Sequence, residues 1–285
     1  MVLVGRRRIF MIISPLTALA LLSVFIYQAS GPWTDLSTER AKLVLANAFA
    51  VSRPDYRIRA DPSKEADIGP RGGTVPLLVD PRSAYPLNKG DEATREAAVE
   101  LLPSGDVSAP HLRPWYLTSV IGSSGESAPI GLTPKDQGLV DLPDKNKYLR
   151  ALVMVELSAS TSAKTVDAWL LNGIDVAIFR LQNDSKGSVS WDDSFCDDKS
   201  LPCASDHPMP ASDGFQLWVS TLRDEDAPLL ARLNLDLGEL RRLSQAGTVE
   251  GFIASVELEE IKSLSQNRQV KSVEIISVSL GDGRD

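Results

Sequence analysis

The sequence predicts an α+β fold in three parts: an N-terminal transmembrane helix, an irregular spacer, and a ferredoxin-like layer with a long disulfide-stapled insertion. Three observations lead to this prediction. A long uncharged apolar run follows three arginines near the N-terminus, and proline and glycine recur through residues 55–147. Two β-α-β patterns of similar length, with alternating apolar residues in their strands, then follow in the C-terminal half.

The apolar run at residues 9–33 predicts a transmembrane signal-anchor. Its core, residues 9–27, is 19 residues long, which is enough to cross a bilayer at about 1.5 Å per residue. Positive charge stays on the cytoplasmic side, so residues 1–8, with their three arginines, are expected in the cytoplasm and the bulk of the chain outside. Trp33 resembles an interfacial anchor. The sequence therefore predicts a single-pass protein of the plasma (inner) membrane, with the lipid bilayer as one partner.

A cleaved signal peptide is the alternative for the same segment. Such a peptide has a shorter apolar region and small residues before its cleavage site. The best candidate is cleavage after Gly31, which places Pro32 directly after the scissile bond, where its fixed φ suits a protease poorly. The sequence therefore favours the uncleaved anchor.

The charge balance excludes nucleic acid as a partner. The chain has 30 Lys and Arg residues against 38 Asp and Glu residues, a formal net charge of −8. Nucleic acid repels such a chain, because binding to phosphate depends on Lys and Arg. We therefore expect an acidic domain outside the membrane.

Residues 34–147 predict one helix followed by an irregular, Pro- and Gly-rich region. Apolar residues recur at helical spacing from Leu36, and Arg53-Pro54 ends the pattern, so a membrane-proximal helix is expected there. A second helix is expected at residues 91–102, before Pro103. The remainder predicts only short strands between breakers.

Residues 148–285 predict the α+β domain. Two strand-helix-strand units of matching length indicate one sheet with helices on one face. The apolar phase slips between Ile275 and Ile276, which indicates a β-bulge or a strand buried on both faces. A leucine-rich helix between the units is expected to begin at Asp226 and to end at Gly247. The expected strands are residues 149–158, 175–182, 248–256 and 270–280, and the expected helices of the units are 160–171 and 257–266.

A long polar insertion at residues 183–213 contains both cysteines, Cys196 and Cys203. A close pair of cysteines in an exported protein predicts a local disulfide. The alternative is a metal site that recruits His207 as a third ligand, but the pair lacks the tight spacing of structural zinc. No cofactor is predicted.

The same insertion is the candidate partner-binding surface. Two aromatic rings beside a stapled loop would give anchors on a preordered surface. A calcium site built from the carboxylates is an alternative, although no EF-hand spacing is present. Another is that both rings pack onto the domain's own core. The candidate residues are Trp191, Phe195, Asp192, Asp193, Asp197 and Asp198.

Catalytic motifs are missing from the sequence. The chain has two histidines, His111 and His207, both in polar loops. The stretch Gly122-Ser123-Ser124-Gly125-Glu126 departs from G-x-S-x-G, because Glu126 occupies the last glycine position. The sequence therefore predicts a protein that is not an enzyme.

Residues 148–280 resemble the extracytoplasmic C-terminal domain of bacterial sigma factor regulators. The resemblance lies in residues 151–158 with 166–169 and 176–179, and in residues 251–255 with 257–258 and 270–273. It implies a membrane-anchored sensory or regulatory domain that binds an envelope protein. Only residues 1–8 precede the apolar core in this sequence, so we expect no counterpart of that family's cytoplasmic sigma-binding segment.

Residues 248–276 also resemble the second half of subtilisin propeptides and related inhibitors. The resemblance lies in residues 251–254, 259–261, 264 and 270–274. It implies a compact domain that holds a serine protease through a strand edge. The two resemblances agree on fold more closely than on function. A protease-inhibitory module is therefore the alternative to a sensory domain, and strand edges at residues 248–256 or 270–280 are the expected contact.

Overall fold

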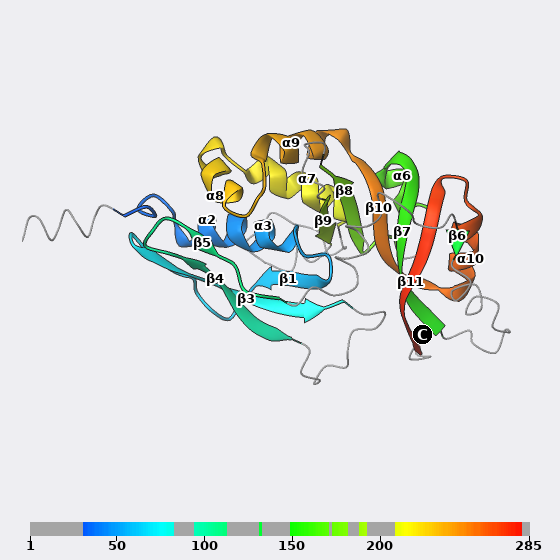
Figure 1. The fold of residues 1–285 in the computed structure, drawn as a ribbon, viewed down its shortest axis with the longest axis horizontal. Coiled ribbons are helices and arrows are strands. Elements are labelled where there is room, and N and C mark those ends of the chain that lie inside the picture. The colour runs from blue at the N-terminus through cyan, green and yellow to red at the C-terminus, as the bar shows by residue number, and fades with distance from the viewer. Residues whose placement is uncertain are drawn as a thin grey trace, which may run out of the picture.

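The computed structural model describes residues 31–82, 94–112, 131–132, 149–170, 173–181, 188–192 and 209–280. These residues form two mainly antiparallel sheets with helices between and around them. Figure 1 shows the smaller sheet and the larger sheet toward opposite ends of the molecule, with the N-terminal helix beside the smaller one. One continuous hydrophobic core includes residues of both sheets.

The N-terminal helical segment packs into this core. It consists of α2 (Thr38–Ala41), a π-helical stretch (Lys42–Ala46) and α3 (Asn47–Ala50), and the Ser37 side chain caps its start by accepting a hydrogen bond from Arg40 N. The apolar side chains on one face are fully buried, including Phe49. This confirms the predicted helix after residue 34. It is a core element of the domain.

The smaller sheet lies where the sequence predicted irregular structure. Its strands are β1 (Tyr56–Ala60), β2 (Asp67–Gly69), β3 (Gly72–Pro81), β4 (Arg95–Leu101) and β5 (Val107–Ser108). β3 is central, with β1 and β2 on one side and β4 on the other. Pro76 is tolerated in this central strand because it falls between the stretches paired with β2 and β1.

The larger sheet has the strand order β6-β11-β7-β10-β8-β9. All neighbouring strands are antiparallel except β6 and β11, which pair in parallel at two positions. Register shifts occur between Val249 and Gly251, between Val270 and Ser272, and between Ile275 and Ser277. The last shift confirms the predicted irregularity near Ile276. The strands are β6 (Gly131–Leu132), β7 (Leu149–Ser162), β8 (Val176–Arg180), β9 (Ser188–Asp192), β10 (Thr248–Glu257) and β11 (Val270–Leu280).

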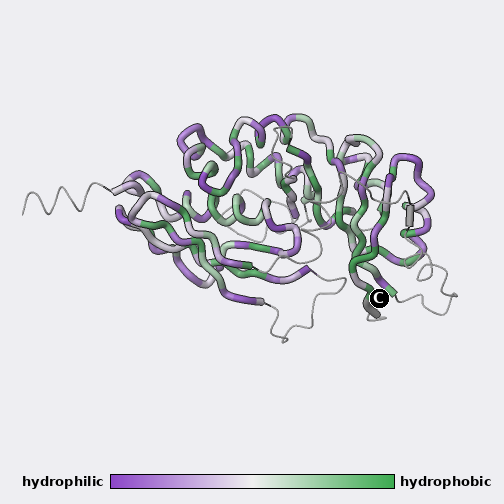
Figure 2. Tube along the Cα trace, viewed as in Figure 1, coloured by the Kyte–Doolittle hydropathy of each residue, from purple (hydrophilic) through white to green (hydrophobic). Residues whose placement is uncertain are grey.

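The larger sheet is apolar on both faces. Residues 151, 153 and 155 of β7 belong to the main core, whereas Leu152 and Met154 form a second cluster with residues of β8 and β10. Alternate side chains of a strand point to opposite faces, so both faces of the sheet are buried. Figure 2 shows the long hydrophobic stretches of these strands.

The described part of the chain has six further helical elements. α6 (Ala163–Asp167) follows β7, and α10 (Leu258–Gln266) connects β10 to β11. The expected leucine-rich helix is interrupted: a 3-10 turn (Asp224–Asp226) leads into α8 (Ala227–Ala231), and α9 (Leu237–Ala246) follows after Asn234 at a positive φ. Gly247 ends α9 in the left-handed conformation, as predicted. α7 (Ala211–Thr221) precedes them.

The predicted architecture is therefore wrong, although the class α+β is correct. The structure contains two sheets, in place of an irregular spacer followed by one ferredoxin-like layer. Residues 95–101 of the expected helix at 91–102 form the strand β4. Their alternation of inward Ala97, Val99 and Leu101 with outward neighbours is a strand pattern, and pairing with β3 stabilises it. The predicted disulfide falls on Cys196 and Cys203, which lie outside the described residues.

The prediction of a single-pass membrane protein is also corrected. Within the described residues, no helix is long and apolar enough to cross a bilayer. Residues 9–30 of the expected span lie outside those residues, and residues 31–33 belong to a turn region. Trp33 is only 5% exposed and donates a hydrogen bond from Nε1 to Leu102 O at 2.8 Å, so its ring belongs to the domain core.

Close contact between β7 and β10 at Gly251 gives a stability prediction. A Cβ at this position would lie 2.6 Å from the carbonyl oxygen of Val155. Gly251→Ala is expected to lower the free energy of unfolding by about 1–3 kcal/mol, because the ladder must open to admit the methyl group. Urea unfolding measures this. Gly247→Asn is the control, since asparagine tolerates the left-handed conformation, and we expect a change within about 0.5 kcal/mol. An equal loss in both variants would contradict the steric explanation.

Candidate functional site

The predicted partner-binding residues are only partly described. Trp191 and Asp192 end the strand β9, whereas Phe195, Asp193, Asp197 and Asp198 lie outside the described residues, as does His207. Trp191 is 4% exposed, and its ring stacks on Trp218 with a centroid distance of 5.0 Å. Phe215 of α7 also contacts it. The ring of Trp191 therefore packs onto the domain's own core, as in the alternative to partner binding that the sequence left open.

Asp192 joins the larger sheet to the smaller one. Its carboxylate forms an ion pair with Arg82, which follows β3 and is almost completely buried. Arg82 also donates from Nε to Pro54 O at 2.9 Å. Close by, Ser190 N donates to Val51 O at 2.8 Å. The end of β9 is thus held by the segment between α3 and β1, and Asp192 has a structural role at this junction.

Asp175, at the start of β8, lies in the same electrostatic environment. Burial raises the pKa of its carboxyl group, while the neighbouring charges of Arg82, Arg57 and Arg150 and a hydrogen bond from Ser255 N oppose the rise. Three arginines from different segments therefore oppose the effect of burial on this carboxyl group.

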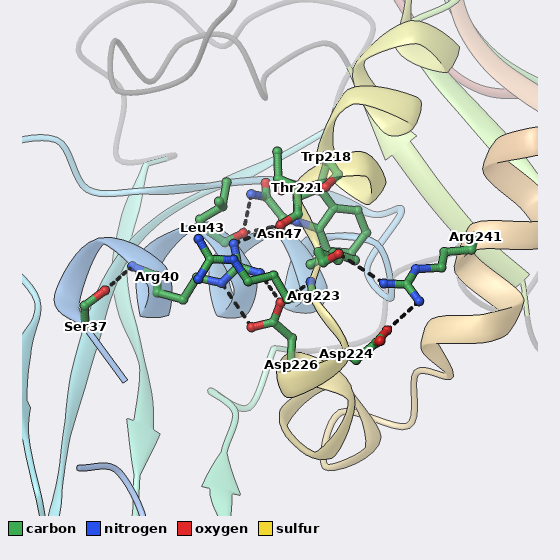
Figure 3. Close-up of polar contacts among 11 residues, drawn as sticks. Ser37, Arg40, Leu43, Asn47, Trp218, Thr221, Arg223, Asp224, Asp226 and Arg241 are labelled. Carbon is green, nitrogen blue, oxygen red and sulfur yellow. Dashed lines mark hydrogen bonds and ion pairs between the residues drawn. The ribbon is translucent and has the colours of Figure 1, made fainter. Parts of the chain in front are cut away.

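A second polar joint connects the N-terminal helix to the segment after α7 (Figure 3). Arg40 contacts both carboxylate oxygens of Asp226 and donates from Nη1 to Thr221 O at 2.9 Å. The side chains are only 15% and 6% exposed. Arg223 N also donates to Asp226 at 2.7 Å. Asp226 occupies the N-cap position of α8, as predicted, but its carboxylate holds Arg40 and does not cap the helix.

The π-helical stretch contributes to the same joint. The carbonyl oxygen of Leu43 accepts hydrogen bonds from Asn47 Nδ2 at 2.8 Å and from Trp218 Nε1 at 3.1 Å. Figure 3 shows these side chains converging from the helix and from α7. A π-turn is wider than an α-turn, and such turns often occur at functional positions. Here the turn presents a carbonyl to α7, which fixes the helix against the larger half of the molecule.

The outer edge of β4 has main-chain groups directed away from the sheet. β5 pairs with β4 only at Glu100 and Leu101, and Leu102 N donates to Asp106 O at 2.9 Å at the end of that hairpin. In an antiparallel ladder, alternate residues direct both N–H and C=O to the same side. The groups of Ala98 and Glu96 therefore point to the β5 side. Within the described residues, no strand pairs with them.

The sequence explains why β5 stops so early. Continuing the register that pairs Glu100 with Ser108 would place Pro110 opposite Ala98. Proline has no N–H to donate, so it cannot complete the hydrogen-bonded pair at this position. Pro110 is therefore a local signal that β5 ends before Ala98, which our interpretation of residues 91–102 as a helix missed.

Among the described strands, β1 and part of β11 also have a side with no paired strand. β10, one of the expected contact strands, is interior, because it pairs with β7 on one side and with β8 on the other. β11, the other, pairs with β7 along most of its length and with β6 at Ser272 and Val273. At the far edge, Ser190 of β9 donates to Val51. We select the edge of β4 as the candidate site because the β5 hairpin identifies its outward main-chain groups and Pro110 prevents β5 from pairing with them.

This edge has a definite local chemistry. Glu96 and Glu100 lie on the solvent face of β4, on either side of Ala98, and the Glu96 side chain is 70% exposed. Lys64 forms an ion pair with Glu96. On the opposite face, Val99 is buried in the core and positions the strand firmly. The arrangement can donate and accept main-chain hydrogen bonds beside two carboxylates. Within the described residues, no group of acidic, His or Cys side chains is placed to hold a metal ion.

Comparisons with protein-family models, with curated proteins and with solved structures found no match to this chain.

The Arg40–Asp226 pair gives a second stability prediction. Arg40→Met is expected to lower the free energy of unfolding by about 3–5 kcal/mol, because it leaves the buried Asp226 carboxylate without its partner. Thermal and urea unfolding measure this. The control is Asp224→Asn, which breaks an exposed pair with Arg241 and should change stability by no more than about 1 kcal/mol. Similar effects of the two variants would contradict a central role for Arg40.

Asp175 gives a pH prediction. Its pKa is raised in the folded state, so the folded protein binds this proton more tightly than the unfolded chain does. Its contribution to the free energy of unfolding should therefore fall as the pH rises through the unfolded and then the folded pKa of the group. Asp175→Asn should remove this pH-dependent contribution to the free energy of unfolding. Urea unfolding between pH 3 and pH 7, roughly the range of carboxyl titration, measures the change.

The pKa of Asp61 is shifted in the opposite direction, so this residue is the matched control. The hydrogen bond from Ser63 lowers its pKa, so its contribution is present above the unfolded pKa and is lost as the pH falls through the folded one. Asp61→Asn should therefore change the pH profile with the opposite sign. Identical changes in the two variants would contradict both assignments.

Proposed function

We propose that this chain is a non-catalytic regulatory domain that binds another protein by strand addition at the outer edge of β4. The observation that carries the proposal is the pair of main-chain positions, Glu96 and Ala98, whose N–H and C=O groups point away from the sheet. An extended segment laid against this edge forms hydrogen bonds with both residues and extends the sheet by one strand.

The surroundings of the edge favour this use. β4 is paired with β3 along its whole length, and Val99 and Leu101 are anchored in the core. The edge is therefore held in position before binding, which lowers the entropy lost on association. The resemblance of residues 148–280 to the outer domain of bacterial sigma factor regulators supports the regulatory part of the proposal.

Site-specific photo-cross-linking in intact cells tests the proposal. A photoreactive amino acid at Thr94, which is exposed and directly precedes β4, should capture a partner. The same group at Gln245, on the exposed side of α9, is the control and should not capture it. Adding Ala98→Pro should abolish capture at Thr94, since it removes an outward N–H without removing a bond to β3.

Three outcomes are informative. Capture at Thr94 that depends on Ala98 supports the proposal. Capture that persists with Ala98→Pro, or the absence of capture at Thr94, would contradict it. If the captured protein is a secreted serine protease, the regulation is inhibitory, as in the alternative suggested by the propeptide resemblance.

A further inference from the structure

The partner strand at β4 is defined further by the side chains beside the edge. Side chains of alternate residues share a face, so Glu96, Ala98 and Glu100 form one row on the solvent side of β4. Ala98 is the only small residue of this row, and it lies between the two carboxylates. A long side chain opposite Ala98 therefore has room to extend across the strand.

The charges of Glu96 and Glu100 determine which charge is favoured on a partner side chain opposite Ala98. Residues diagonal to one another across an antiparallel pair are about 7–8 Å apart, within reach of long side chains. A residue opposite Ala98 is diagonal to both Glu96 and Glu100. Lys64 already contacts Glu96, whereas Glu100 is exposed on the other side of Ala98. An arginine or lysine opposite Ala98 would lie between both carboxylates, and an acidic residue there would be repelled by both.

We infer that the partner of β4 is an extended protein segment with a basic residue opposite Ala98 and apolar residues on either side of it. The inference rests on the proposed function and names the partner's chemistry. The flanking residues of the segment point to the opposite face, beside Ala97 and Val99, whose side chains face the core. The segment covers residues 95–99, because β5 occupies the edge from Glu100 onward.

A second copy of the chain fits this edge less well. Antiparallel pairing of β4 with itself over residues 95–99 places Ala97 opposite Ala97 of the second copy and Glu96 opposite Ala98. The two Glu96 side chains then become diagonal neighbours on one face, and like charges in such positions destabilise a sheet. A heterologous basic strand avoids this repulsion.

Binding of cyclic β-hairpin peptides to the full chain tests the inference. The free strand of the first peptide reads Val-Arg-Val-Thr-Thr, so that its arginine lies opposite Ala98 when it pairs antiparallel to residues 95–99. Two further peptides carry Glu or Gln in place of Arg. Fluorescence anisotropy at low salt should show about tenfold tighter binding of the Arg peptide than of the Glu peptide, with the Gln peptide between them.

Charge reversal on the protein completes the test. Glu96→Lys with Glu100→Lys should invert the preference between the Arg and Glu peptides. Glu225→Lys with Glu259→Lys makes the same change in net charge at exposed positions of other elements, and it should leave the order unchanged. An unchanged order in the first variant, or an inverted order in the second, would overturn the inference.

The outcomes separate this inference from the proposed function. N-methylation of the peptide's Arg amide removes a main-chain hydrogen bond without altering the protein, and together with Ala98→Pro it should abolish binding. Equal binding of all three peptides, lost on N-methylation, would retain strand addition and overturn the basic partner. Failure of every peptide to bind would overturn both. Sedimentation showing a dimer that Ala98→Pro dissociates would instead identify a second copy as the occupant.

Discussion

The buried pair formed by Arg40 and Asp226 fixes the helix on which both halves of the structure depend. This helix covers the inner face of the smaller sheet, and Trp218 of α7 donates a hydrogen bond to its Leu43 carbonyl. Two charged groups can remain in such a place because Arg40 donates to both oxygens of the carboxylate from Nε and Nη2 and to Thr221 O from Nη1. The pair therefore determines the relative position of elements more than 180 residues apart along the chain.

Much of the larger sheet was predictable because its strands are defined by local patterns. The apolar, β-branched runs at residues 151–157 and 270–276, and the glycine that ends α9, indicate their structures without tertiary information. The smaller sheet was not predictable in this way. Its strand β4 contains Ala97 and Ala98, which also suit a helix, and only pairing with β3 decides the conformation.

The candidate site at the edge of β4 could not be predicted from the sequence, for a related reason. Trp191 and the acidic residues near it attract attention as chemical groups, yet the ring of Trp191 completes the core, and Asp192 holds Arg82. The edge of β4 has no distinctive side chain, since its donors and acceptors belong to the backbone. Which backbone groups remain unpaired is a property of sheet order, and a single sequence does not encode that order locally.

The early end of β5 has an evolutionary consequence. One nucleotide change converts a proline codon into a codon for serine, threonine, alanine or leucine, each of which has an amide hydrogen. Replacing Pro110 in this way would let the chain extend its own hairpin over Ala98 and close the edge from within. Pairing of β5 with Ala98 can therefore be gained or lost by a single mutation, without any change in the core.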